Sequence, residues 1–96
     1  MYSFEWDEYK NMINKRKHGI GFEEAVTVFW DDQAVLIPDP EHSWGEERFL
    51  ILGRSKTENV LVVVHCYRDN ETVIRIISAR KAVKKERQQY EDQFGR

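Results

Sequence analysis

The stretch "VLVVVHCYRDNETVIRIIS", residues 60–78, decides the fold because it holds two β-rich runs on either side of a short polar turn. Both runs have the composition and the length that are typical of strands. Asp69 and Asn70 tolerate positive φ, which a two-residue hairpin turn requires. We therefore predict an antiparallel hairpin in which Arg68 stands opposite Glu71.

Arg75 is the unusual residue of this hairpin because it interrupts an apolar strand. In the predicted register it shares a sheet face with Cys66, whereas His65 lies on the other face. A buried charge costs on the order of several kcal/mol unless it is paired. The sequence leaves two interpretations open: a salt bridge from Arg75 to Glu46 or Glu47, or a groove with Arg75 on its floor.

Outside this hairpin, hydrophobic periodicity and turn residues predict six further elements. They are a strand at residues 2–6, helices over 7–18 and 22–29, strands at 34–37 and 48–54, and a helix over 79–94. In the first helix Tyr9, Met12 and Ile13 fall at helical spacing and form its apolar stripe. The order β-α-α-β-β-β-β-α defines an α+β class with a small antiparallel sheet, and 96 residues fit one domain over residues 1–96.

Composition and charge exclude several classes of protein. No apolar run approaches the roughly 18 residues that span a bilayer, and the acidic, aromatic start is unlike a signal peptide. One cysteine, Cys66, cannot form an intrachain disulfide, so we expect a cytoplasmic protein. Residues 1–50 carry 5 basic and 11 acidic side chains, and residues 51–96 carry 10 basic and 6 acidic ones. This asymmetry predicts one cationic face despite a net charge of −2.

Histidines are the natural candidates for proton transfer because their pKa lies near neutrality. We interpret His65, in the middle of a strand, as a core residue, and His42, in a loop with Pro and Gly, as exposed. The helix dipole is a sufficient structural reason for His18 at the end of a helix. Three dispersed histidines and scattered carboxylates give no metal-binding pattern, so we expect no metal.

Several side chains could contact a nucleic acid. Four cations lie on or near the ends of predicted strands: Arg54, Arg75, Arg80 and Lys81. They converge only if their side chains lie on the same face of the sheet, and residue spacing alone does not show this. The cations of the last helix are interpreted first as a solvated face; they are Lys84, Lys85 and Arg87. The tryptophans are interpreted as core or interface anchors, with Trp44 left open as a base-stacking residue; they are Trp6, Trp30 and Trp44.

Three ordered blocks resemble one known family. They are "FEWDEYKNMINKRKHGIGFEEA" (residues 4–25), "DPEHSWGEERFLILGRS" (residues 39–55) and "RIISARKAVKKERQQYE" (residues 75–91). These blocks resemble the F-x-W-D opening, the central H-S-x-G-E-E-R-F block and the closing R-I-I-S-A-R block of the BrnT family of type II toxins. The resemblance extends over residues 4 to 91.

The resemblance implies a RelE-like fold and a ribonuclease toxin that cleaves RNA and inhibits translation. Toxins of this fold need no metal or other cofactor and use the 2′-hydroxyl of the substrate as nucleophile. The resemblance also implies a BrnA antitoxin with a ribbon-helix-helix part, assembled as two toxins and two antitoxins on operator DNA. A catalytically inactive module that holds this antitoxin is the alternative interpretation.

The resemblance also suggests which residues act. Phosphate and transition-state ligands are expected at Arg54, Arg75 and Arg80. Proton transfer is expected at His18 or Lys17, with His42 or Glu47 as alternates. Further RNA contacts are expected at Lys15, Arg48, Lys81, Lys84 and Lys85. Val83 stands where the family has a Thr that completes a capping box with Glu86.

Overall fold

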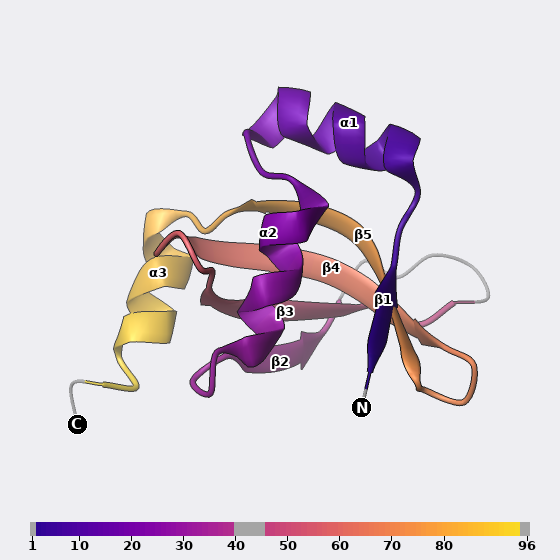
Figure 1. Ribbon diagram of the computed structural model, residues 1–96. Helices are drawn as coiled ribbons and strands as arrows, with labels where there is room; N and C mark the ends of the chain where they lie inside the picture. The colour runs from indigo at the N-terminus through magenta and orange to yellow at the C-terminus, as the bar shows by residue number, and fades with distance from the viewer. Residues whose placement is uncertain (1, 40–45, 95–96) are drawn as a thin grey trace.

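The computed structural model describes residues 2–39 and 46–94 of the chain and has the predicted α+β architecture (Figure 1). Its elements are β1 (Ser3–Glu5), α1 (Glu8–His18), α2 (Phe22–Val26), the 3₁₀ helix η1 (Thr27–Trp30), β2 (Val35–Pro38), β3 (Phe49–Arg54), β4 (Val60–Arg68), β5 (Val73–Lys81) and α3 (Lys84–Glu91). The strands form one sheet in the order β1-β5-β4-β3-β2. All neighbours are antiparallel except β1, which pairs in parallel with β5. None of the described helices is long and apolar enough to cross a membrane.

The central hairpin is present, but its turn is longer than predicted. Asp69, Asn70 and Glu71 all have positive φ, and Arg68 stands opposite Val73 instead of Glu71. The prediction of a two-residue turn was therefore wrong by two positions. Because side chains alternate with a period of two, a slip of two residues keeps the side chains of residues 65–68 and 73–76 on their predicted faces. Arg75 accordingly shares a face with Cys66, its direct partner.

A register shift between Val64 and His65 changes the second half of β5. Beyond it, Arg80 stands opposite Val62. The strand continues to Lys81, so the prediction of a helix from residue 79 was wrong: α3 begins at Lys84. Local helix propensity is overridden because β4 offers backbone partners as far as its first residue, where Ala82 N–H donates to the carbonyl of Val60.

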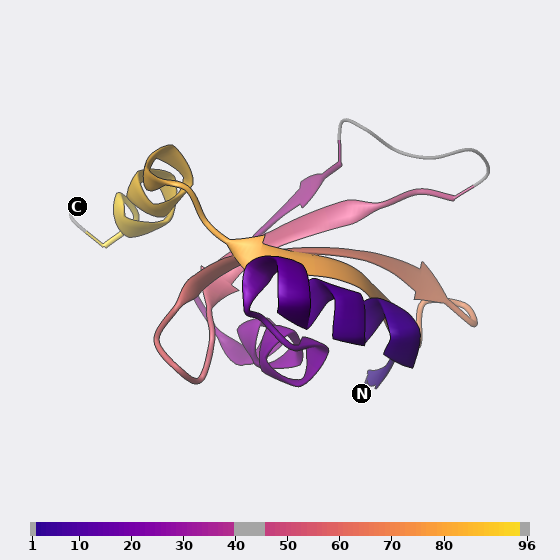
Figure 2. The same ribbon diagram turned by 90° about the horizontal axis from the view of Figure 1, so that it is seen from above.

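The sheet lies between α1 and α2 on one side and α3 on the other (Figure 2), and each side has its own core. One face packs against the α1–α2 segment, and its buried residues include Phe22, Val28, Leu61, Val63, Ile74 and Ile76. The other face is covered at one end by α3, with Leu52, Val60, Val62, Ala82 and Tyr90 as its smaller core. Since α3 spans only eight residues, part of this second face keeps half-buried side chains, among them Leu50, Val64 and Arg75.

The predicted apolar stripe of α1 was assigned to the wrong face. Tyr9, Met12 and Ile13 are 68%, 48% and 43% exposed, and the buried residues of the helix are Asn11 and Asn14. The reason lies in β5, whose edge is covered by β1 only at residues 73–75.

Asn14 completes the uncovered edge of β5 in the way that a neighbouring strand would. Its amide donates to the carbonyls of Ala79 (2.7 Å) and Ile20 (2.8 Å), and its oxygen accepts the Ala79 N–H (3.1 Å). Asn11 accepts the N–H of Phe22 (2.8 Å) and so supplies the cap that Gly21 lacks a side chain to give. Buried backbone groups require partners, and this requirement orients α1 with its amide side chains inward.

Candidate nucleic-acid interface

Strand direction brings cations together at one end of the sheet. β3 and β5 both run antiparallel to β4, so their C-terminal ends, at Arg54 and at Arg80 and Lys81, lie at the same end. Helix α3 starts beside them and adds Arg87. We call Arg54, Arg80, Lys81 and Arg87 the cationic end.

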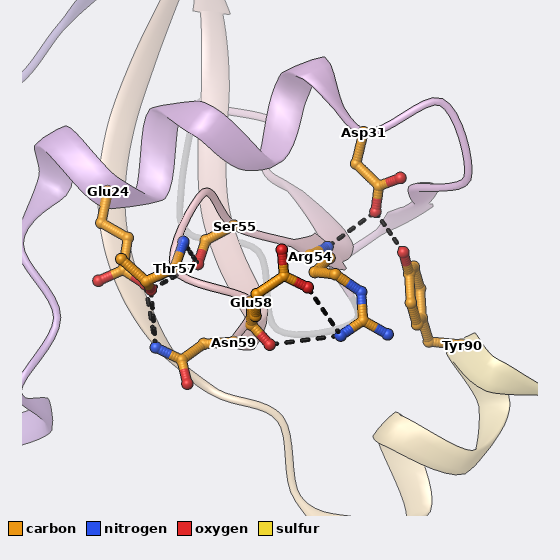
Figure 3. A network of polar contacts seen from close by, with 8 residues as sticks. All are labelled: Glu24, Asp31, Arg54, Ser55, Thr57, Glu58, Asn59 and Tyr90. Carbon is orange, nitrogen blue, oxygen red and sulfur yellow. Dashed lines mark hydrogen bonds and ion pairs between the residues drawn. The ribbon is translucent and has the colours of Figure 1, made fainter.

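Arg54 is held in place by a polar network (Figure 3). Its N–H donates to Asp31 Oδ2 (2.8 Å), and the hydroxyl of Tyr90 donates to the same oxygen. The guanidinium lies over the Tyr90 ring, with its carbon 5.6 Å from the ring centroid, and donates to the Glu58 carbonyl (3.3 Å). Burial, together with the bond to Asp31, raises the pKa of Tyr90 to about 12. Burial alone would raise the pKa of Asp31, but the hydrogen bonds that it accepts outweigh burial and lower it.

The loop between β3 and β4 is fixed around the carboxylate of Glu24 (Figure 3). Ser55 donates to Glu24 Oε2 at 2.6 Å and Asn59 donates at 3.2 Å, with Thr57 as a third donor. Burial opposes ionisation of Glu24, but these donors prevail and lower its pKa. The loop that follows Arg54 is therefore tied to α2, which limits the freedom of the arginine's backbone.

Arg80 is fixed by a bidentate pair with Glu86, at 2.8 and 3.0 Å. Hydrogen bonding within this pair raises the pKa of Arg80 and lowers the pKa of Glu86. Glu86 also accepts the N–H of Val83 (2.9 Å), so half of the capping box survives although Val83 has no acceptor in its side chain. An anionic ligand would have to compete with Glu86 for Arg80.

A cleft of about 240 Å³ opens between the strand ends and α3. Its cations are Arg54, Lys81 and Arg87, and its carboxylates include Glu58 and Glu91. Lys81 is exposed and forms no ion pair with a described residue. Arg87 donates to the Ala82 carbonyl (3.1 Å), which holds its guanidinium beside the cleft.

Arg75 lies on the same face as Arg80 but away from the cationic end. It stands opposite Cys66, and Arg80 stands opposite Val62; four strand residues span about 13 Å. Of the two interpretations left open for Arg75, the structure shows an ion pair, but the partner is Glu5 of β1 at 2.9 Å and not Glu46 or Glu47.

The hairpin end of the same face holds a second group of charges. Glu46 accepts a hydrogen bond from Arg68 (2.9 Å). Arg48 precedes β3, and its buried Nε has no hydrogen-bond partner among the described residues. The described structure therefore divides the expected cations between two ends of one face.

The proton-transfer candidates differ in placement. His18 and Lys17 end α1, and His18 lies one turn beyond Asn14, the residue that contacts β5. Figures 1 and 2 both direct this end of α1 toward the side on which α3 lies. Lys15 pairs with Glu23 of α2 at 3.8 Å. His42 lies outside the described residues, and Glu47 is exposed near the hairpin end.

His65 is the core residue that the sequence predicted. It is fully buried, and its ring packs edge-on against Phe29 at 4.9 Å between centroids. Its Nδ1 lies 3.2 Å from the Val63 carbonyl, and its Nε2 lies 3.4 Å from the Tyr67 hydroxyl. Burial lowers its pKa to about 4, so it is neutral at pH 7 and takes no part in the surface site.

Sequence reasoning missed three residues that shape this end of the molecule: Asp31, Lys56 and Tyr90. Tyr90 is 1% exposed although it belongs to a helix of charged and amide side chains. A lone aromatic in such a helix could have indicated its anchoring role. Trp30 is 65% exposed, so it is not a core residue, and its other predicted role, as an interface anchor, stays a prediction.

The fold and this candidate interface define a small α+β protein with four cations grouped at one end of its sheet. Comparison with protein families matches residues 6–86 to BrnT, the ribonuclease toxin of a type II toxin-antitoxin system. The chain therefore belongs to the BrnT family, as its motifs indicated. Among solved structures it is similar to the 1.1 Å crystal structure of the Brucella abortus ribonuclease toxin BrnT, with a TM-score of 0.65 and 20% identity over 88% of this chain and 100% of that one. No curated protein sequence matches the chain.

Proposed function

We propose that this protein is an endoribonuclease that cleaves RNA without a metal ion and thereby inhibits translation in the cytoplasm. Membership of the BrnT family supports the ribonuclease class. The observation that carries the proposal is the cleft of the cationic end, where Arg54, Lys81 and Arg87 converge. The three cations outnumber the two carboxylates of the cleft, Glu58 and Glu91, so its net charge is positive and suits an RNA phosphate. Attraction between cations and phosphates does not depend on the base sequence.

In the proposed reaction a base removes the proton of the 2′-hydroxyl, and the 2′-oxygen attacks the adjacent phosphorus. The bond from phosphorus to the 5′-oxygen breaks, an acid protonates that oxygen, and a 2′,3′-cyclic phosphate remains. Negative charge grows on the non-bridging oxygens in between, and fixed cations stabilise it most effectively. Arg54 suits this task because Tyr90 and Asp31 hold it in place before substrate binds.

Roles for the remaining residues are proposed from the elements on which they lie. Lys81 and Arg87 join Arg54 as phosphate ligands, and Arg80 contributes once phosphate competes with Glu86. Lys84 and Lys85, exposed on the first turn of α3, extend the same positive surface. Arg48 and Arg75 lie where a longer RNA would continue along the sheet face. We assign proton transfer to His18, with Lys17 beside it, because α1 ends toward the side of the molecule on which α3 lies.

The test is cleavage of a labelled single-stranded RNA by purified protein in excess EDTA. Lys81→Ala removes one charge-assisted contact worth about 1.5–3 kcal/mol, so kcat/KM should fall about 10- to 150-fold. Lys10→Ala is the matched control, because Lys10 is also exposed but lies on α1 and does not line the cleft. The proposal fails if wild-type protein leaves RNA intact in EDTA, or if both variants cleave like wild type.

We also propose that the antitoxin is a BrnA-like ribbon-helix-helix protein and that two toxins and two antitoxins bind operator DNA together. The type II family supports an antitoxin partner. Co-expression with such a protein, followed by mass measurement of the purified complex and an operator-binding assay, tests the composition. A complex of any other stoichiometry, or one without DNA affinity, would reject it.

A second candidate function is a subunit that only binds a partner. The outward triad of Tyr9, Met12 and Ile13 on α1 favours it, because clustered apolar side chains at one helix face commonly mark an interface. Growth of a bacterium that expresses the toxin without antitoxin separates the two roles. Arrest of growth by wild type and relief by Lys81→Ala support the enzyme, whereas unimpaired growth with an intact antitoxin complex supports the subunit.

A further inference from the structure

A second groove lies on the other side of Arg54. It has a volume of about 420 Å³ and runs between η1 and the loop that follows β3. Its lining residues are Thr27, Trp30, Asp31, Arg54, Ser55 and Lys56. The volume falls within the roughly 300–1,000 Å³ of small-molecule sites. Arg54 lines both this groove and the cleft of the cationic end, so the two are adjacent.

The polar groups in the groove are largely committed to other protein groups. Lys56 N–H donates to the Thr27 hydroxyl (2.9 Å), and the Ser55 hydroxyl donates to Glu24 (2.6 Å). Asp31 accepts bonds from the N–H of Arg54 and from the Tyr90 hydroxyl. These bonds join the two walls of the groove, so its shape is set before any ligand arrives.

The groups in the groove that could contact a ligand are the ring of Trp30 and the cations of Arg54 and Lys56. Trp30 is 65% exposed, which is unusual for the largest apolar side chain. Its ring is supported from one side by Phe4, at 5.8 Å between centroids. Lys56 is exposed and forms no ion pair with a described carboxylate. An aromatic face beside cations fits a nucleotide, whose base stacks while its phosphate meets the positive charge.

We propose that Trp30 is the stacking platform for one nucleobase of the RNA substrate, next to the phosphate held by Arg54, with Lys56 at the neighbouring phosphate. The inference rests on the proposed ribonuclease function and deepens it, because it names a base-binding subsite outside the cleft. A nucleotide chain that passes Arg54 would place its scissile phosphate in the cleft and a flanking base on Trp30. Stacking tolerates every base, so the platform would add affinity more than sequence preference.

The experiment measures binding of a fluorescein-labelled, 2′-fluoro single-stranded RNA by anisotropy, since the missing 2′-hydroxyl prevents cleavage. Loss of one stacked base costs about 1–3 kcal/mol, so Trp30→Ala should raise Kd about 5- to 150-fold. Trp30→Phe keeps an aromatic face and should recover most of the affinity. Tyr9→Ala is the matched control, because Tyr9 is equally exposed but lies on α1, outside the groove.

A set of RNAs, each lacking the base at a single position, distinguishes stacking from a general effect on structure. At one position the cost of Trp30→Ala should vanish, because the base that stacks is already gone. The inference is overturned if Trp30→Ala and Tyr9→Ala bind every RNA alike, or if Trp30→Ala lowers only the affinity for the antitoxin, which would make the groove a protein contact. If wild-type protein neither binds nor cleaves RNA, the proposed function itself has failed.

Discussion

Replacement of Asn14 by Ala tests the orientation of α1 and should be among the most destabilising changes in the chain. The amide is 6% exposed and bonds three backbone groups: the N–H and carbonyl of Ala79 and the carbonyl of Ile20. A buried polar group without a partner costs about 1–3 kcal/mol, and water can reach some of the three, so we expect a total of about 3–5 kcal/mol. A chain of this length is stable by about 5–14 kcal/mol, at roughly 0.05–0.15 kcal/mol per residue.

The assay is urea unfolding followed by circular dichroism, with Ile13→Ala as the adjacent control. Ile13 is 43% exposed, and surface substitutions usually change stability by no more than about 0.5 kcal/mol. If instead the apolar stripe of α1 packed inward, Ile13→Ala would cost about 2–5 kcal/mol. A larger loss for Ile13→Ala than for Asn14→Ala would refute the reasoning.

Asn14→Asp adds a test by pH. The introduced carboxyl keeps the shape but faces two carbonyl oxygens, which disfavours its charged form and raises its pKa in the folded protein. A raised folded-state pKa contributes stability that is present at low pH and lost as pH rises through that value. The variant should therefore be most stable in acid. An unchanged difference from wild type across the acidic range would contradict this account.

Three further predictions concern ionisable groups. The pKa of Tyr90 is raised to about 12, so the stability that its neutral hydroxyl contributes is complete below about pH 10 and lost as pH rises through 12. In the Tyr90→Phe variant, the free energy of unfolding measured in urea should no longer fall over this alkaline range. The pKa of His65 is lowered to about 4, so the free energy of unfolding should fall by on the order of 3 kcal/mol as pH drops from about 6.5 to 4. An NMR titration that finds the imidazole of the folded protein charged at pH 6 would disprove this prediction. The pKa of Glu86 is lowered chiefly by its bonds to Arg80, so its stabilisation holds above its ordinary pKa and is lost as pH falls through the folded-state value. Glu86→Gln should abolish that acid-dependent part while circular dichroism still reports a folded α3.

Sequence patterns identified the strands of the hairpin reliably because each strand carries its own signal. The run from Val60 to Cys66 is apolar enough to require burial on both faces, whatever the rest of the chain does. The sheet faces predicted for the residues beside the turn were also correct although the turn length was wrong, because a slip of two residues preserves the alternation of side chains. The buried role of His65 followed from the same strand pattern.

Other features depended on partners distant in the sequence. The end of β5 at Lys81 reflects hydrogen bonds to β4, which outweigh the helix propensity of the local residues. The stripe of Tyr9, Met12 and Ile13 has helical spacing, but spacing does not reveal which face carries the stronger requirement for burial. That requirement came from the open edge of β5, satisfied by Asn14 across 65 residues of sequence.

Local periodicity and composition were enough to predict the class of fold, the order of its elements and the cationic C-terminal half. The sequence also carried the motifs of the BrnT family. Only the tertiary structure decided which cations meet. Parallel directions of β3 and β5 bring Arg54 and Lys81 to one end, whereas Arg75 lies about 13 Å along the strand from Arg80 and pairs with Glu5. Strand direction and register are properties of the whole sheet, so no segment specifies them alone.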